Sequence, residues 1–270
     1  MKTSKTLAIF ALHLLIAVFC TFTDVLSQDE EVKPDSVQSL PKNRTSIFQA
    51  GYTYRWLNTQ SLNTVLAQSG YSHLAGGMWD VFFSNSTHLP NGILLQNNYS
   101  IGLPLTSRRA ANDKSFTATL AQGTLSSSIG YNFLTSENFR IQAMVGLEAQ
   151  LYYLNLLQRR IDLDFAQSIN DSESEVVRNF WIPRVNLPIM VSTEFKAFTI
   201  YFPSNTPNIS IPVPYFIQLA LGYTIGLSDG LPINSQKSAP MLPAGGPLVR
   251  IAIGVNESEY TQKLEASKKQ

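Results

Sequence analysis

The stretch FRIQAMVGLEAQLYYL, Phe139 to Leu154, decides the fold, because apolar and mostly polar residues alternate along its whole length. Successive side chains of a β-strand point to opposite faces, so this pattern predicts one long strand with an apolar face and a face of small, polar and charged groups. Strands in soluble domains usually have about 5 to 6 residues, whereas a tilted strand that crosses a bilayer needs about 9 to 11. The apolar face therefore meets either a soluble core or lipid.

Alternation of the same kind recurs along the chain and predicts an all-β, antiparallel transmembrane β-barrel of about eight strands. The tight LTSEN connection at 134–138 makes the pair around it the clearest hairpin, whereas the second strand is short and weak, and Pro188 interrupts the sixth. Ten strands are possible if Lys196 to Ser210 hides a further hairpin. The expected strands are Ile47–Trp56, Gly77–Phe83, Ile93–Leu105, Phe116–Phe133, Phe139–Leu154, Val185–Phe195, Tyr215–Gly226 and Pro247–Val255.

The expected connections alternate in length, as short turns on one side and longer loops on the other do in an outer-membrane barrel. The long ones are Leu57–Ala75, Asn155–Asn179 and Leu227–Gly245, which we expect on the outside of the cell, the second as an exposed loop. Leu62, Val65 and Leu66 lie at helical spacing and predict a short helix in the first of them. The segments NSTHLPNG at 85–92 and SRRAANDKS at 107–115 are interpreted as a turn and a polar loop.

The composition of the two faces of the predicted strands indicates that the apolar face meets lipid on the outside of the barrel. Aromatic residues such as Trp56, Tyr131 and Tyr223 gather on the apolar face, and a soluble barrel could not leave such a face in water. The polar face supplies the candidates for lining the lumen: Arg55, Arg140, Gln142, Glu148, Gln150, Arg184, Glu194 and Arg250. Side chains fill the interior of an eight-stranded barrel, so we expect these groups to pair with one another and to leave no pore.

The N-terminus predicts export. Residues 1–27 combine Lys2 and Lys5 with an apolar run that is shorter than the ~20 residues of a spanning helix, which favours a cleaved signal peptide over a membrane anchor. Residues 28–44 are interpreted as a flexible leader, 45–255 as the barrel and 256–270 as a polar C-terminal tail. Cleavage would remove Lys2, Lys5 and Asp24 from the 20 basic and 19 acidic residues, leaving 18 of each, and would remove the only cysteine, Cys20.

That composition excludes several classes of protein. A neutral mature chain argues against a nucleic-acid-binding protein, which would carry a basic surplus. The absence of cysteine from the mature chain argues against a disulfide-stapled module and against thiolate zinc sites. Charged residues make up 14% of the chain, compared with about 25% in ordinary soluble domains. We expect no cofactor, no metal and no nucleic-acid partner.

Between residues 47 and 255 the chain resembles the small, porin-like outer-membrane β-barrel proteins of Gram-negative bacteria. The resemblance depends on the strand pattern and on segments such as IGYNFLTSENFRIQAMVGLEA at 129–149 and FIQLALGYTIGL at 216–227. It implies a location in the bacterial outer membrane, with membrane lipids and the barrel assembly machinery as partners. A possible extracellular partner would bind through the 155–179 loop.

The expected function is a non-enzymatic structural or surface-interaction role, and three alternatives stay open. Charged groups that line an open channel would instead suit a narrow porin for small solutes. A lipid A-modifying barrel enzyme would need a His and a Ser near the membrane, for which His73, His88, Ser84 and Ser86 are candidates, although both histidines are interpreted as loop residues and no carboxylate is spaced to orient His88. Gly77-Met78-Trp79 matches the short Gly-x-Trp pattern of lipocalins, a weak signal that the lipid-facing pattern opposes.

Overall fold

The computed structural model describes residues 45–112, 114–136, 138–160, 175–203, 210–228 and 245–256. The predicted signal peptide, the leader and nearly all of the C-terminal tail lie outside the described residues. Within this part of the chain, strands begin at Thr45 and end at Asn256, one residue beyond the predicted barrel.

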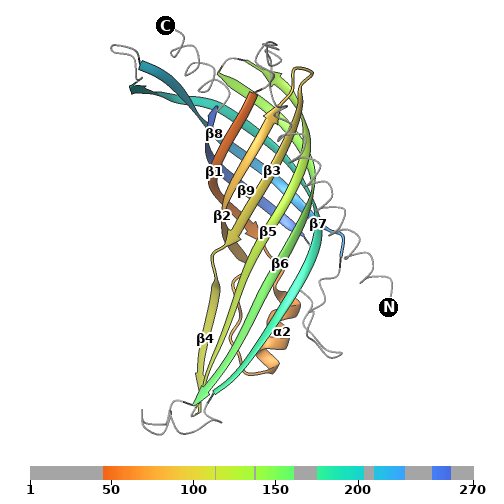
Figure 1. The fold of residues 1–270 in the computed structure, drawn as a ribbon. Coiled ribbons are helices and arrows are strands. Elements are labelled where there is room, and N and C mark those ends of the chain that lie inside the picture. The colour runs from red at the N-terminus through yellow and green to blue at the C-terminus, as the bar shows by residue number, and fades with distance from the viewer. Residues whose placement is uncertain are drawn as a thin grey trace, which may run out of the picture.

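Eight strand positions close into an antiparallel β-barrel (Figure 1), which confirms the predicted fold class. Around the ring the order is β1, β2, β3, β5, β6, β7, β8 and β9, and β9 pairs with β1. The short strand β4 continues the position of β3, since both pair with β5. The elements are β1 (Thr45–Trp56), α2 (Gln60–Gln68), β2 (Gly77–His88), β3 (Ile93–Gly102), β4 (Leu105–Ala111), β5 (Lys114–Thr135), β6 (Phe139–Arg160), β7 (Glu175–Pro203), β8 (Ser210–Gly226) and β9 (Gly246–Asn256).

Several strands are longer than the alternation predicts. The second strand continues through the expected turn to His88, so the turn shrinks to Leu89–Gly92. The interpretation of SRRAANDKS as a loop is wrong, because its residues pair in the β4–β5 hairpin, where Asn112 takes a positive φ of 55°. Both faces of this hairpin carry polar residues, so its sequence lacks the alternation of apolar and polar residues that predicts a strand.

The two long connections predicted on either side of β7 are also partly strand. β6 runs to Arg160 and β7 starts at Glu175, so both ends of the expected Asn155–Asn179 loop are paired, and residues 161–174 lie outside the described part. The suspected extra hairpin in Lys196–Ser210 is wrong as well. Residues up to Pro203 and from Ser210 prolong β7 and β8 themselves, so the ring keeps eight strands.

Pro188 is accommodated within β7. Its partner across the β7–β8 pair is Thr224, whereas the β6–β7 ladder skips from Val145↔Ile189 to Glu148↔Asn186 with no change of register. Proline has no N–H to donate, so the ladder loses bonds locally while the side-chain alternation continues.

The strand registers sort the connections to two ends of the barrel. The α2 connection, the β4–β5 hairpin, and the gaps after β6 and after β8 lie at one end, and the turns after β2 and β5 lie at the other, where the described chain also begins and ends. Such asymmetry is typical of outer-membrane barrels, with short turns in the periplasm and longer loops outside the cell. We therefore call the α2 end extracellular and the opposite end periplasmic.

The outer surface of the barrel is apolar. Val145 and Leu151 on β6, Ile189 and Val191 on β7, and Leu221 on β8 are 40 to 65% exposed, whereas the residues between them point inward. Water would penalise such a continuous apolar band, and a bilayer requires it. Ring closure also leaves no unpaired sheet edge along this band. The described helix, α2, is not long and apolar enough to cross a membrane.

Aromatic residues border the band at both ends. Near the extracellular end the ring centroids of Tyr54 and Trp79 are 4.9 Å apart, and those of Tyr153 and Trp181 are 4.6 Å apart. Near the periplasmic end Tyr131 packs against the bulge residue Phe133 at 5.6 Å. These pairs form the two interfacial girdles that transmembrane barrels carry, and the bacterial outer membrane is where single-chain barrels with an even number of strands occur.

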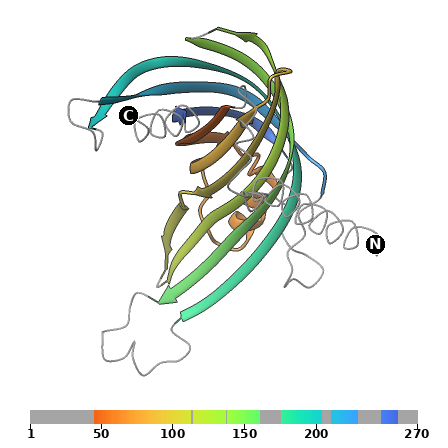
Figure 2. The same cartoon turned by 45° about the horizontal axis from the view of Figure 1, so that its top comes forward.

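Beyond the extracellular rim, β4 and the adjoining parts of β5, β6 and β7 continue as a curved sheet, with α2 lying against it (Figures 1 and 2). We call this part, together with residues 57–76, the extension. Its strands are uninterrupted continuations of barrel strands, so the extension is part of the wall rather than a separately linked domain.

Candidate functional site: the interior of the barrel

All eight residues predicted to line the lumen lie on the inner side of the wall. Seven are at most 6% exposed, and the side chain of Arg140, near the periplasmic rim, is 15% exposed. Alternation places them there, because each belongs to the residue set that shares a face with buried neighbours along its own strand. Their position follows the sequence pattern, whereas any functional role for them stays a prediction.

The central feature of the interior is Arg55 on β1. Its Nε donates to Asp80 on β2 at 2.6 Å, and its two terminal nitrogens donate to the Glu148 carboxylate on β6 at 3.0 and 2.8 Å. β1 and β6 are four strands apart in the ring of eight, so this ion pair spans the barrel. The two-pronged geometry fixes both partners, and removing either carboxylate would leave a buried charge poorly compensated.

Amide side chains extend this network around the wall. The Asn186 amide donates to Glu148 at 3.1 Å and to Gln150 at 2.9 Å. Gln150 donates to Gln122 at 2.6 Å, and Gln122 in turn donates to Asp80. Both carboxylates therefore accept hydrogen bonds from neutral side chains as well as from Arg55, as buried charges require.

Two further layers cross the interior nearer the periplasmic end. Arg250 donates from β9 to Asn98 on β3 at 3.0 Å, and its guanidinium lies 4.2 Å from the centroid of the Phe82 ring. Glu194 on β7 accepts from Gln49 on β1 at 2.7 Å and lies 3.7 Å from Arg140. The interior is thus bridged at three levels, and each bridge joins strands that are not neighbours.

Arg184 and Gln142 complete the predicted set. Arg184 donates to the backbone carbonyl of Ser228 at 3.2 Å, and the hydroxyl of the same serine accepts from the backbone N–H of Val185. These bonds hold the chain that leaves β8 against β7. Gln142 is fully buried on the inner face of β6, opposite Asn132 and level with the periplasmic girdle.

Asp80 is the important interior residue that the sequence reasoning missed. It is fully buried and binds Arg55, yet the short second strand predicted no lumen residue there. The inward set of β2 includes Met78 and Phe82 beside Asp80 and Ser84, so apolar residues occur on both faces. A buried arginine on the neighbouring predicted strand was the available signal for an acidic partner.

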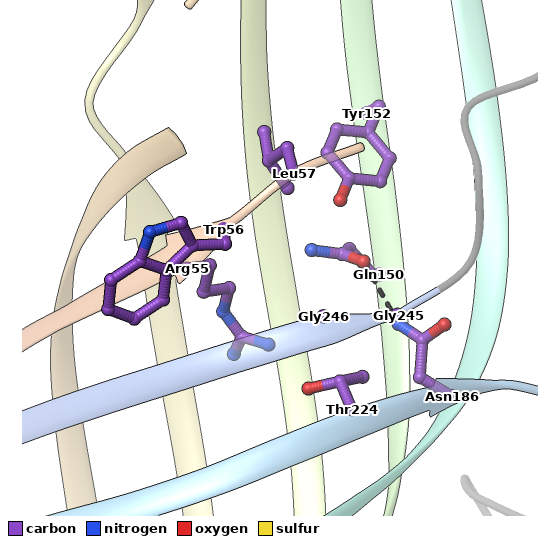
Figure 3. Close-up of a pocket in the computed structure, with 9 residues that line it drawn as sticks. All are labelled: Arg55, Trp56, Leu57, Gln150, Tyr152, Asn186, Thr224, Gly245 and Gly246. Carbon is purple, nitrogen blue, oxygen red and sulfur yellow. Dashed lines mark hydrogen bonds between the residues drawn. The ribbon is translucent and has the colours of Figure 1, made fainter. Parts of the chain in front are cut away.

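A small pocket opens where the network meets the extracellular mouth (Figure 3). Arg55, Gln150, Asn186 and Thr224 supply polar groups, and Tyr152 and Leu57 close one side. Its volume of about 20 Å³ suits a single water molecule, far below the several hundred Å³ of an ordinary ligand site.

Beyond this pocket the extension has an apolar core of its own. Leu62 and Leu66 of α2 are buried against residues of the curved sheet, including Leu120, Leu154 and Ile182. Tyr71, which follows α2, packs edge-on against Phe116 with ring centroids 5.4 Å apart, and burial raises the pKa of its phenol. Asn63 fastens the helix, since its amide exchanges hydrogen bonds with the backbone of Leu74 at 2.8 and 3.0 Å.

Of the candidate His and Ser residues of a lipid-modifying enzyme, Ser84, Ser86 and His88 share the inner face of β2, whereas His73 lies apart from them. His73 is an exposed loop residue near α2, as expected, whereas His88 lies at the periplasmic end of β2 and is 6% exposed. The interpretation of His88 as a loop residue is therefore wrong, because the strand continues through it. In the described part of the chain its ring pairs with the Asn132 amide at 3.3 Å, while Ser84 donates to Gln49 and Ser86 to the carbonyl of Ile47.

Solved structures that match this chain include three outer-membrane barrels. Neisserial surface protein A matches with a TM-score of 0.35 and 11% identity, over 79% of this chain and 94% of that chain. Ail, the attachment invasion locus protein of Yersinia pestis, matches with a TM-score of 0.37 and 10% identity, over 79% and 97%. The N-terminal β-barrel domain of Pseudomonas aeruginosa OprF matches with a TM-score of 0.33 and 13% identity, over 80% and 99%.

No family model matches the sequence, and the curated proteins include no match. At such low identities and TM-scores the similar structures say nothing about activity, and the assignment of a transmembrane barrel depends on the closed ring and its inverted surface.

Proposed function

We propose that this protein is a non-enzymatic outer-membrane barrel with a closed interior, whose role is structural or is surface interaction through the extension. The observation that carries the proposal is the Arg55 ion pair, which joins β1 to Glu148 on the opposite strand β6 and also holds Asp80 on the neighbouring β2. An open pore needs a continuous water-filled path, and this pair lies directly across it. The interior charges support the wall instead of selecting a solute.

The extension supports the second half of the proposal. It holds β4 and long stretches of β5, β6 and β7 beyond the girdle, and its own apolar core keeps it ordered there. A barrel that only spanned the membrane would not need the extension. A rigid sheet outside the cell suits contact with a partner, and the 155–179 region at its tip is where we expect that contact.

The test of a closed interior is ion conductance across planar bilayers that contain the refolded protein. We expect no steady single-channel steps, with insertion checked on the same preparation by the mobility difference between boiled and unboiled samples. Steps of uniform size that scale with protein concentration would contradict a closed interior and favour the narrow porin.

The test of the non-enzymatic role is mass analysis of lipid A from cells with the protein, without it, and with His88→Ala. We expect identical lipid A in all three, because His88 is buried and pairs with an amide rather than with a carboxylate. A modified species that depends on the protein and disappears in His88→Ala would show a lipid A-modifying enzyme.

A further inference from the structure

The periplasmic ends of β7 and β8 leave the barrel together as a two-stranded ribbon. Residues after Lys196 pair only with β8, and residues before Tyr215 pair only with β7, since β6 starts at Phe139↔Phe195 and β9 ends beside Tyr215 in the described chain. The ribbon, Phe198–Pro203 with Ser210–Tyr215, is about 20 Å long at the usual rise per residue. It projects sideways from the rim (Figures 1 and 2).

A β-bulge decides which face of the ribbon continues the lipid-facing surface. Phe195 pairs with Ile217 and Phe198 with Tyr215, so β7 takes three steps where β8 takes two, and Ala197 is the extra residue. Without it, Thr199 and Tyr201 would follow the outward face. With it, the outward face carries Phe198, Ile200 and Phe202, because one extra residue exchanges the faces of a strand.

The resulting face is apolar, and its side chains from β7 are exposed, whereas Val213, opposite Ile200 on β8, is buried. Phe198, Ile200 and Phe202 are 47, 40 and 39% exposed, and Phe198 stacks on Tyr215 with ring centroids 5.1 Å apart. The stack adjoins the Phe139↔Phe195 pair of the periplasmic rim. An isolated two-stranded ribbon is marginally stable in water, so a face of this kind needs a cover.

We propose that this face lies on the phospholipid of the periplasmic leaflet and extends the membrane contact of the barrel sideways. Continuity carries the assignment, because the face is the same one that meets lipid in Val191 and Leu221, prolonged across the bulge. The inference rests on the membrane location of the barrel.

Pairing of the ribbon with another strand is the less suitable alternative. Pro203, Pro212 and Pro214 lie within it, and proline supplies no N–H to an added strand. Aromatic side chains at an interface between water and acyl chains are instead the usual composition of a membrane contact.

The test uses single cysteines in a Cys20→Ser background, labelled with an environment-sensitive fluorophore and refolded into phosphatidylcholine and phosphatidylglycerol vesicles. Ile200→Cys and Thr199→Cys report the two faces of the ribbon. Val191→Cys on the barrel wall reports lipid contact, and His73→Cys in the extracellular loop reports water. Each label is quenched separately by a spin-labelled phospholipid and by aqueous iodide, and the boiled-against-unboiled mobility confirms folding of every variant.

We expect the Ile200 label to be quenched by lipid several-fold more than the Thr199 label, with the reverse order for iodide. Deleting Ala197 should exchange the two responses. Equal iodide quenching at both positions would overturn the proposal, and so would protection of Ile200 from both quenchers, which would mean that protein covers the face. If Val191 also failed to meet lipid, the membrane location itself would be wrong, so the two failures are distinguishable.

Discussion

The wall of the barrel and the extension are built from the same strands and have opposite polarity. In the membrane part of β6 the inner face holds Gln142, Glu148 and Gln150, while the outer face holds Val145 and Leu151. A few residues further, the inner face holds Tyr152, Leu154 and Leu156. The outer face changes as well, to Asn155, Leu157 and Arg159. The strand β6 therefore passes from lipid into water, and the change in the polarity of its two faces marks the membrane boundary.

The difference shows what stabilises each region. Lipid surrounds the wall, so its outward side chains gain nothing by clustering. Buried polar bonds, closed ladders and one apolar cluster of Leu94, Met144, Met190 and Leu248 hold the interior. Water surrounds the extension, so burial of Leu62, Leu66 and their neighbours against the sheet stabilises it as in a soluble protein. Substitutions with the same chemistry should thus have different effects in the two regions.

Loss of a carboxylate from the interior network should have the largest effect. Glu148→Ala leaves Arg55 buried with one acidic partner, and we expect a loss of about 3 to 5 kcal/mol in the free energy of unfolding. Denaturant unfolding in lipid vesicles measures it. Glu175→Ala, which removes an exposed carboxylate from the extension, is the control and should leave the midpoint nearly unchanged. Equal midpoints for the two variants would refute a structural ion pair.

Truncation in the core of the extension should come next. Leu66 is 1% exposed, and Leu66→Ala should cost the extension about 2 to 5 kcal/mol through lost contacts and the cavity left behind. The readout is protease cleavage within residues 57–76 beside the mobility of the intact barrel. We expect faster cleavage with an unchanged barrel. Val65→Ala, on the exposed side of α2, is the matched control, and equally fast cleavage of both variants would mean that α2 is not packed as described.

Arginine on the outer face compares the two regions on one strand. Val145→Arg places a charge in the apolar band and should cost about 2 to 4 kcal/mol. Leu157→Arg, on the same face beyond the girdle, should change stability by no more than about 0.5 kcal/mol. Unfolding midpoints of the two variants in lipid vesicles measure the difference. Similar losses of stability at both positions would contradict the proposed membrane boundary. Gly146 is no suitable control, because a Cβ there would lie 2.7 Å from the carbonyl oxygen of Ser127.

Epitope insertion should have the smallest effect on stability and tests the orientation. A short epitope inserted after Asn112, in the β4–β5 turn, should be detected on intact cells. The same epitope between Asn91 and Gly92, in the turn after β2, should be detected only after the outer membrane is permeabilised. The opposite pattern would invert the topology and place the extension in the periplasm.

The sequence predicted the parts of the fold in which a strand has lipid on one face and the polar interior on the other. Period-two alternation located the membrane parts of β1, β5, β6, β8 and β9, because lipid and a polar interior impose it directly. Alternation fails where β6 and β7 pass into water, since apolar residues change face there and the pattern resembles a loop. The β4–β5 hairpin was missed because polar residues lie on both of its faces: Arg108 and Arg109 lie on opposite faces of β4, and both are exposed.

For the interior the sequence indicated which side chains point inward, but not which of them meet. Arg55 and Glu148 belong to the predicted inner set, yet their contact depends on register around half of the ring, which no local pattern specifies. Asp80 was missed because Met78 and Phe82 share its face. The bulge at Ala197 is equally invisible, as a single extra residue leaves no signature in the composition.

The most direct test of the change of solvent along one strand is a nitroxide scan of the odd positions of β6, from Ile141 to Arg159, in lipid vesicles. Power saturation compares accessibility to oxygen, which concentrates in the bilayer, with accessibility to a water-soluble nickel complex. We predict oxygen-dominated responses from Ile141 to Leu151 and nickel-dominated responses from Asn155 to Arg159, with the crossover near Tyr153. Nickel-dominated responses along the whole strand would show a barrel in water, and oxygen-dominated responses through Arg159 would place the extension inside the membrane.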